Sequence, residues 1–306
     1  MIKSKDRVCM YGVPMDLGRG HRGVDMGPSG FRIAGIREGI ESLGLAFEDR
    51  GNIPVEISQR LDPGDENARF IGPIAAACEK LRDAVQGVLA EEGFPLVVGG
   101  DHSIAVGTIA GVTSHFHARN EEIGLIWFDA HGDFNTPETS PTGNVHGMPL
   151  ASVLGYGHDS LVNIGKRVPM VKPENVVLIG IRDIDDGERK LIRESNIKTY
   201  TMYDIDRIGM AQVAAEAIEH VTKNTVGFHV SFDLDGCDPS IAMGVGTPVP
   251  GGVGFRESHY LLESVAKNGG MVSLEMTEID PLLDDRNATA ELARDLVLSA
   301  LGKSIL

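Results

Sequence analysis

The chain has 306 residues, and its 28 lysines and arginines against 44 aspartates and glutamates give a formal charge of −16. This length allows one large domain or two small ones, with enough chain to bury a core without disulfides. The acidic balance argues against nucleic-acid and anionic-membrane partners, which need a basic surface, and it favours a small cationic ligand.

The three cysteines are far apart and form no CxxC pair: Cys9, Cys78 and Cys237. This usage is typical of reduced thiols, so we expect a cytoplasmic protein. No signal-peptide core follows the basic N-terminus. The longest uncharged stretch, 239–255, contains five glycines and three prolines, which predict a loop and not a membrane helix.

Short apolar runs alternate with longer amphipathic segments along the whole chain. The runs predict eight buried strands, at 8–13, 46–48, 95–98, 125–128, 176–181, 198–202, 227–232 and 271–274. Apolar residues at helical spacing predict helices at 28–43, 74–88, 104–110, 188–193, 211–221, 257–266 and 290–301, the first of them with Pro28 in its first turn. Several strands are continuous in Val, Ile and Leu, as in a parallel sheet covered on both faces. We therefore predict right-handed βαβ units in one open α/β sheet.

Polar clusters follow four of the predicted strands. They read GGDHS at 99–103, DAHGD at 129–133, DLDG at 233–236 and EMTEID at 275–280. Ligands of open α/β sheets bind beyond the carboxyl ends of the strands, so these clusters predict one site. Because a division of the chain would split that site, we expect a single domain over residues 1–306.

The spacing within two of these clusters is typical of metal ligands. On extended backbone, Asp129, His131 and Asp133 lie on one side, and Asp233 and Asp235 repeat the pattern. Four carboxylates would repel one another without cations, and two divalent ions would balance them. An oxygen-rich set with some imidazole and no thiolate favours Mn²⁺, with Co²⁺, Ni²⁺ and Fe²⁺ as lesser candidates. The six candidate ligands are His102, Asp129, His131, Asp133, Asp233 and Asp235.

Other interpretations compete with some of these motifs. A single DxD after a strand is usually a turn or a helix cap, whereas DxHxD together with a second DxD and GGDH is not explained in that way. The segment 18–23 matches GxGxxG after the first strand. In a dinucleotide site the helix starts directly after the strand. Here about fourteen residues separate Val13, the end of the first predicted strand, from the start of the predicted helix at Pro28. We expect a loop over the carboxyl edge of the sheet instead.

The motifs GGDHS, DAHGD and SFDLDGCDP resemble those of the ureohydrolases, the family of arginases and agmatinases, from about Val8 to Gly302. The resemblance implies a three-layer αβα sandwich with an eight-stranded, mostly parallel sheet. It also implies two Mn²⁺ ions per chain. The first ion would bind His102 and Asp133, the second His131 and Asp235, and Asp129 and Asp233 would bridge them together with a hydroxide.

The segment after DAHGD resembles that of arginases. The resemblance assigns Asn135, Ser140 and Thr142 to the substrate α-carboxylate, Asp185 to the α-amino group, Thr247 and Glu278 to the guanidinium, and His146 to a proton shuttle. An α-amino acid does need donors beside an acceptor. An amine without the carboxylate would leave those donors unpaired, at about 1–3 kcal/mol each. Turn chemistry at Ser140 and Thr142 and a helix cap at Asp185 remain alternative interpretations.

These assignments imply hydrolysis of L-arginine to L-ornithine and urea by a metal-bound hydroxide. Asp133, His146 and Glu278 would be the catalytic residues. Three alternatives remain: an agmatinase or another guanidino hydrolase, a single-zinc enzyme of the deacetylase type, and a non-catalytic homologue. The resemblance also implies a homotrimer or homohexamer, with Arg256 and Glu257 between subunits.

Overall fold

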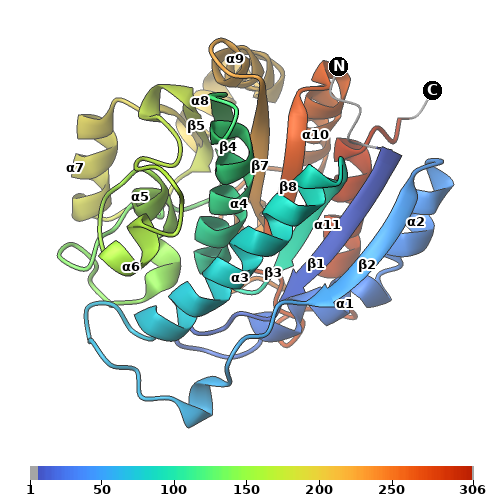
Figure 1. The fold of residues 1–306 in the computed structure, drawn as a ribbon. Coiled ribbons are helices and arrows are strands. Elements are labelled where there is room, and N and C mark those ends of the chain that lie inside the picture. The colour runs from blue at the N-terminus through green and yellow to red at the C-terminus, as the bar shows by residue number, and fades with distance from the viewer. Residues whose placement is uncertain (1–5, 305–306) are drawn as a thin grey trace.

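A computed structural model describes residues 6–304 (Figure 1). Eight strands form one sheet in the order β2-β1-β3-β8-β7-β4-β5-β6, and every neighbouring pair is parallel. The eight-stranded α/β prediction is confirmed. The strands are β1 (Arg7–Val13), β2 (Ala46–Asn52), β3 (Phe94–Gly99), β4 (Ile123–Phe128), β5 (Val176–Ile181), β6 (Lys198–Thr201), β7 (Gly227–Asp233) and β8 (Met271–Thr277).

Helices cover both faces of this sheet, which makes three layers (Figure 1). One hydrophobic cluster joins the sheet to α3 (Ile71–Ala90), α4 (Ala105–His117), α5 (Pro149–Val153), α6 (Asp159–Val162) and α7 (Asp186–Ser195). The cluster on the other face joins it to α1 (Gly27–Ile33), α2 (Ile36–Ser42), α8 (Met202–Ile208), α9 (Met210–Thr222), α10 (Phe255–Asn268) and α11 (Ala288–Ala300). None of the helices within residues 6–304 is long and apolar enough to cross a membrane.

The sheet explains the apolar runs of the sequence. Alternate residues of β4 pack into opposite clusters: Leu125 and Trp127 on one face, Ile126 and Phe128 on the other. Every residue of β3, β4, β5, β7 and β8 is buried, whereas the edge strands β2 and β6 are partly exposed. A strand that is buried on both faces has no position for a solvated side chain and therefore reads as a continuous apolar run.

The predicted single helix at 28–43 is wrong in its extent. The chain forms α1 and α2 with a break at Ala34 and Gly35, and Gly35 has φ +84°. Glycine adopts this left-handed conformation without a steric penalty, so it ends the first helix even though the isoleucine spacing continues across it. Ile33, which we expected on the buried stripe, is 80% exposed.

The order of the strands brings distant polar clusters together. After β3 the chain skips two positions to form β4, and it returns after β6 to place β7 and β8 in the gap. The four central strands, β3, β8, β7 and β4, are thus the four that are followed by polar clusters. Because all strands are parallel, their carboxyl ends meet at one edge of the sheet.

Candidate metal and substrate site

His102 occupies the start of a short 3-10 helix directly beyond β3. Asp101 caps this turn by accepting the backbone N–H of Ser103 at 3.1 Å. A side chain at Gly100 would lie 2.1 Å from the carbonyl oxygen of Met15, so only glycine permits this tight passage. The imidazole of His102 stacks on the indole of Trp127 with ring centroids 4.2 Å apart. Its ring is therefore held by packing as well as by polar contacts.

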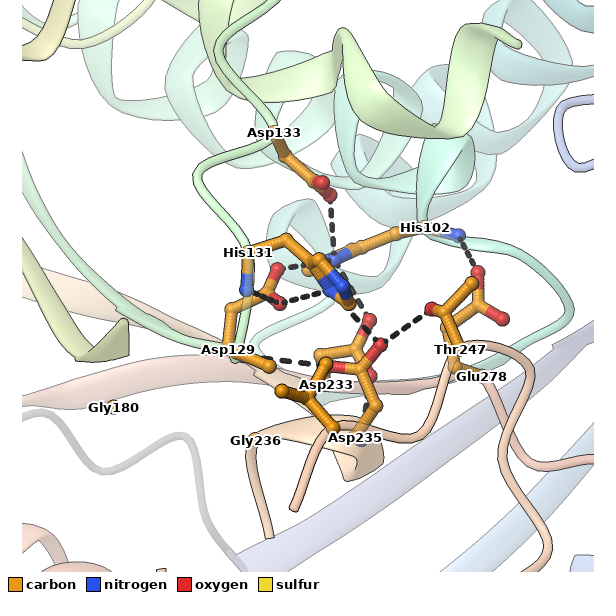
Figure 2. A network of polar contacts seen from close by, with 12 residues as sticks. His102, Asp129, His131, Asp133, Gly180, Asp233, Asp235, Gly236, Thr247 and Glu278 are labelled. Atoms are coloured by element: carbon orange, nitrogen blue, oxygen red, sulfur yellow. Dashed lines mark hydrogen bonds and ion pairs between the residues drawn. The ribbon is translucent and has the colours of Figure 1, made fainter. Parts of the chain in front are cut away.

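The Nδ1 atom of His102 faces three carboxylates (Figure 2). It lies 3.2 Å from Oδ2 of Asp129, 3.0 Å from Oδ2 of Asp133 and 3.0 Å from Oδ2 of Asp233. It is buried, yet it makes no well-oriented hydrogen bond to any of them. Metal ions are held by nitrogen and oxygen atoms gathered in this way around one point. His102, Asp129 and Asp133 form one possible metal-binding group.

A second group shares one of these carboxylates. The Nδ1 atom of His131 lies 3.4 Å from Oδ1 of Asp129 and 3.2 Å from Oδ2 of Asp235. Asp129, His131 and Asp235 form the second possible metal-binding group, so Asp129 belongs to both. Asp233 is in neither group and approaches the site through His102. All six predicted ligands thus meet at one place, although their role as ligands stays a prediction.

The buried carboxylates are electrostatically costly without cations. Burial and the charge of Asp129 raise the pKa of Asp133 to about 6. Burial, followed by the charges of Asp235 and Asp129, raises the pKa of Asp233 well above its usual range. Burial alone would lower the pKa of His131, but the charges of Asp235 and Asp129 raise it. Without metal, the site therefore retains protons that divalent cations would replace.

A ladder of polar pairs between β7 and β8 supports the first group. His229 lies opposite Ser273, Ser231 opposite Glu275, and Asp233 opposite Thr277. The hydroxyl of Ser231 lies 2.8 Å from Nε2 of His102 and donates to Oε1 of Glu275 at 2.6 Å. Such contacts fix the orientation of a ligating histidine.

These supporting residues were not predicted from the sequence. His229 is fully buried, and its Nδ1 lies 2.8 Å from the hydroxyl of Ser273. The available signal was polar residues at every second position of two otherwise apolar strands. That spacing places them on one face of the sheet.

Arg182 supports the turn that carries Asp235, a role that was not predicted from the sequence. Its guanidinium donates to backbone carbonyls on both sides of the DLDG turn, including Asp235 at 2.7 Å, Gly236 at 3.0 Å and Val249 at 2.7 Å. A forked side chain with five donors suits this task. The turn itself packs closely, because a Cβ at Gly236 would lie 2.5 Å from the ring of Phe128. Figure 2 shows Gly236 beside Asp235 at this position.

The predicted amino-acid end of the substrate site is formed by the loop after DAHGD and the start of α7. Asn135 is buried and donates through Nδ2 to Oδ2 of Asp185 at 2.7 Å. The helix-cap interpretation of Asp185 is confirmed, since its Oδ1 accepts the backbone N–H of Glu188 at 2.9 Å. Ser140 and Thr142 each accept a backbone N–H of the same loop, at 3.0 and 3.2 Å, which confirms their turn chemistry. Their contacts with a substrate remain predictions.

Glu278 lies on the other side of the cluster (Figure 2). Its Oε1 accepts the backbone N–H of His102 at 3.1 Å and lies 3.5 Å from Nδ1 of His146. Its Oε2 is buried and has no hydrogen-bond partner. Burial would raise the pKa of Glu278, but its contact with His146 lowers it. Thr247 donates to Oδ2 of Asp235 at 2.8 Å, so it supports a candidate ligand.

Two of these residues have a strained backbone. Asp133 has φ +48° and Glu278 has φ +63°. Residues other than glycine rarely adopt this region, and such strain is concentrated at functional sites.

Comparison with known proteins identifies the family of this chain. The model of the "Arginase family" matches residues 6–302. The chain belongs to the arginase family. It is 52% identical over 300 residues to an arginase of Bacillus caldovelox. The alignment covers 98% of this chain and 99% of that protein. The fold is similar to a solved structure of the arginase from B. caldovelox, with a TM-score of 0.95 and 51% identity; the alignment covers 98% of this chain and 100% of that one.

The similarity extends to more distant members of the arginase family. A solved structure of Entamoeba histolytica arginase, described as a complex with L-ornithine, is 33% identical to this chain. Its TM-score is 0.90, and the alignment covers 98% of this chain and 100% of that one. The sequence-based recognition of the family is therefore confirmed, and so is the sandwich fold that it implied.

Glu188 connects the loop that follows DAHGD to the start of α7, and its buried carboxyl should make stability depend on pH. Its carboxylate accepts backbone N–H groups from Phe134 and Asp185, each at 3.2 Å. Burial and the charge of Asp133 raise its pKa to about 7 from 4.5. The folded protein thus binds this proton more tightly than the unfolded chain, and stability decreases as pH rises from 4.5 through 7. We therefore compare the free energy of unfolding of metal-free Glu188→Gln with that of metal-free wild type, measured with urea. The difference should shift in favour of the variant by about 2 kcal/mol between pH 5.5 and 8.

The matched control is Glu194→Gln, because Glu194 lies on the same helix but is exposed. Its stability relative to wild type should be the same at both pH values. An equally flat difference for Glu188→Gln would show that Glu188 does not retain its proton in the folded protein.

Proposed function

We propose that the chain hydrolyses L-arginine to L-ornithine and urea, with two Mn²⁺ ions bound by the six-residue cluster. The observation that carries this proposal is the position of Glu278. It presents a buried carboxylate oxygen without a hydrogen-bond partner next to the cluster. A guanidinium head supplies the N–H donors that this oxygen lacks, and its positive charge complements the carboxylate. The relatives reported above are named arginases, which supports the same substrate.

The residues of the cluster fit a pair of divalent cations. Nδ1 of His102 is buried without a hydrogen bond among three carboxylate oxygens, and Asp129 is shared by both groups. Two imidazoles and four carboxylates, without a thiolate, suit Mn²⁺ better than structural Zn²⁺. His102 with Asp133 would hold one ion and His131 with Asp235 the other. Asp129 and Asp233 would contact both.

A bound pair of such cations lowers the pKa of a water molecule, so that it can attack near neutral pH. The guanidinium carbon is electron-rich and resists un-ionised water. Asp133 would accept the proton of the attacking water and pass it to the departing amine. Transfer of this proton by a positioned carboxylate is general base and then general acid catalysis.

The amino-acid end of the substrate would be held by the loop that follows DAHGD. The Asn135 amide and the hydroxyls of Ser140 and Thr142 would face the α-carboxylate, and Asp185 would accept from the α-ammonium. In the structure Asn135 and Asp185 are hydrogen-bonded to each other, which places a donor and an acceptor side by side. Agmatine has no carboxylate to match them, so this pair favours arginine over the agmatinase alternative.

The guanidinium end would lie between the metal cluster and Glu278, with Thr247 beside it. His146 contacts Glu278 and has a side chain that is 19% exposed. It therefore reaches from the buried carboxylate to the surface, as a proton relay requires. The position of His102 and Asp133 in a group separate from His131 and Asp235 counts against a single-zinc enzyme. A non-catalytic homologue would be expected to lack a ligand, and all six are present.

The test is a parallel assay of purified protein loaded with Mn²⁺ on arginine, agmatine and guanidinobutyrate, with metal content measured on the same sample. We expect urea and ornithine in equal amounts from arginine, about two metal ions per chain, and loss of activity after chelation. Comparable or higher kcat/KM for agmatine would reject the arginase assignment within the family. Metal binding without urea release from any of the three would favour the non-catalytic alternative.

We also propose a cytoplasmic homo-oligomer, a trimer or hexamer. Within one chain, Nη1 of Arg256 pairs with Glu263 at 3.1 Å, and Glu257 accepts the backbone N–H of Gly254 at 2.9 Å. Both side chains are on α10 near its start, and the contact between subunits that the resemblance implies for them remains a prediction.

A further inference from the structure

Arg19 lies in the segment 18–23, whose GxGxxG spacing has no role in the proposed reaction. The residue is 8% exposed. Its Nη1 donates to Oδ2 of Asp280 at 2.9 Å, and its Nη2 donates to the carbonyl of Gly246. Asp280 is itself buried. A buried arginine that bonds to two other loops is unusual for a surface segment, because burial of a charge is costly unless it is paired.

The segment is attached to the site at several points. The N–H of Gly18 donates to Oδ2 of Asp101 at 2.8 Å, next to His102 in the chain. The carbonyl of Gly18 accepts from the N–H of His146 at 3.1 Å, and the carbonyl of Arg19 accepts from Nδ2 of Asn144 at 3.0 Å. Arg19 and Gly18 thus connect the three loops that carry His146, Thr247 and Glu278.

Arg19 also lies next to the carboxylate of Glu278. A Cβ built on Gly246 would lie 2.4 Å from Oε2 of Glu278 and 2.7 Å from Cζ of Arg19. The guanidinium and the unpartnered carboxylate oxygen therefore face the same side of Gly246. No residue with a side chain fits there without displacing one of them. The turn at Gly246, the carboxylate of Glu278 and the side chain of Arg19 form one packed unit.

We propose that Arg19 is a positioning residue for the guanidinium end of the substrate. It fixes the Gly246 turn and the loop of Glu278 and Asp280 relative to each other. This inference rests on the proposed hydrolysis of a guanidino substrate. The fork of the guanidinium is essential, because one donor bonds Asp280 while another bonds the carbonyl of Gly246. A lysine can keep the ion pair but cannot hold both.

Arg19→Lys is therefore the central variant. We expect KM for arginine to rise about tenfold, with kcat changed less than threefold, because Glu278 would still be present but less well placed. Metal content and the thermal midpoint should stay near those of wild type. Binding of L-ornithine, measured by calorimetry, should change less than threefold, since the product keeps the amino-acid end but has no guanidinium.

A pair of variants separates positioning from simple stability. Arg19→Gln leaves Asp280 buried without a cation and should lower the thermal midpoint. The double variant Arg19→Gln with Asp280→Asn removes that charge and should recover the midpoint, while KM for arginine stays raised. Recovery of KM together with the midpoint would overturn the proposal, because the role of Arg19 would then be structural only.

The control is Arg22→Gln in the same segment. The side chain of Arg22 is 48% exposed and pairs with Asp16 and Asp25 instead of Asp280. It should leave KM unchanged. An unchanged KM in Arg19→Lys would likewise overturn the proposal. The activity of wild type is measured first, so the absence of urea release there would reject the proposed function and not the role of Arg19.

Discussion

Asp129→Asn should abolish binding of both metal ions and lower kcat/KM for arginine by about 10³-fold or more, because unactivated water keeps a pKa of about 15.7. Asp129 is the one residue that belongs to both metal-binding groups found among residues 6–304. Its two oxygens also accept from the indole of Trp127 at 2.9 Å and the N–H of His131 at 2.7 Å. An asparagine can accept only one of these bonds and brings no charge.

The most direct measurement is the increase in thermal midpoint when Mn²⁺ is added to metal-free protein, since a ligand that binds the folded state stabilises it. Wild type should show a large increase, Asp235→Asn a smaller one, and Asp129→Asn none. The control is Asp186→Asn, because the side chain of Asp186 is 98% exposed. A normal metal content in Asp129→Asn would contradict the shared position that we assign to this carboxylate.

Much of this site could be predicted from the sequence because of where its residues lie on the sheet. The four central strands are buried on both faces, so each ends sharply where an apolar run gives way to polar residues. The carboxyl ends of parallel strands share one edge, and the predicted ligands are within a few residues of those ends. Local spacing was therefore sufficient to bring together six candidate ligands from three separate segments.

The residues that were missed act through contacts that local spacing does not reveal. Arg19 and Arg182 bind carbonyls more than fifty residues away in the chain. Ser231 and Glu275 face each other only because β7 and β8 are neighbours, and the sequence does not give that strand order. The break at Gly35 was missed for a related reason, because an apolar spacing can continue through a glycine that ends the helix. Such features depend on tertiary packing.

The second large effect is expected at Glu278. Glu278→Gln should lower kcat/KM for arginine about 10²- to 10³-fold, because the amide keeps one acceptor for the N–H of His102 but presents a donor where Oε2 was. A guanidinium offers only donors, so the NH2 of the glutamine would face guanidinium N–H groups and could not accept a hydrogen bond from them. The attraction between the carboxylate and the guanidinium charge would also be lost. Loss of a buried charge-assisted pair of this kind costs about 3–4 kcal/mol when both effects combine.

Metal content decides how that loss is interpreted. Glu278 is not among the candidate ligands, so Glu278→Gln should keep the metal content and the Mn²⁺-induced stabilisation of wild type, in contrast to Asp129→Asn. Glu278→Asp retains the charge on a shorter side chain and should lose less activity than the amide if charge is the larger part of the effect. A fall in metal content in Glu278→Gln would instead show that Glu278 acts mainly through His102, whose backbone N–H it accepts. Activity within threefold of wild type would exclude Glu278 as the partner of the guanidinium.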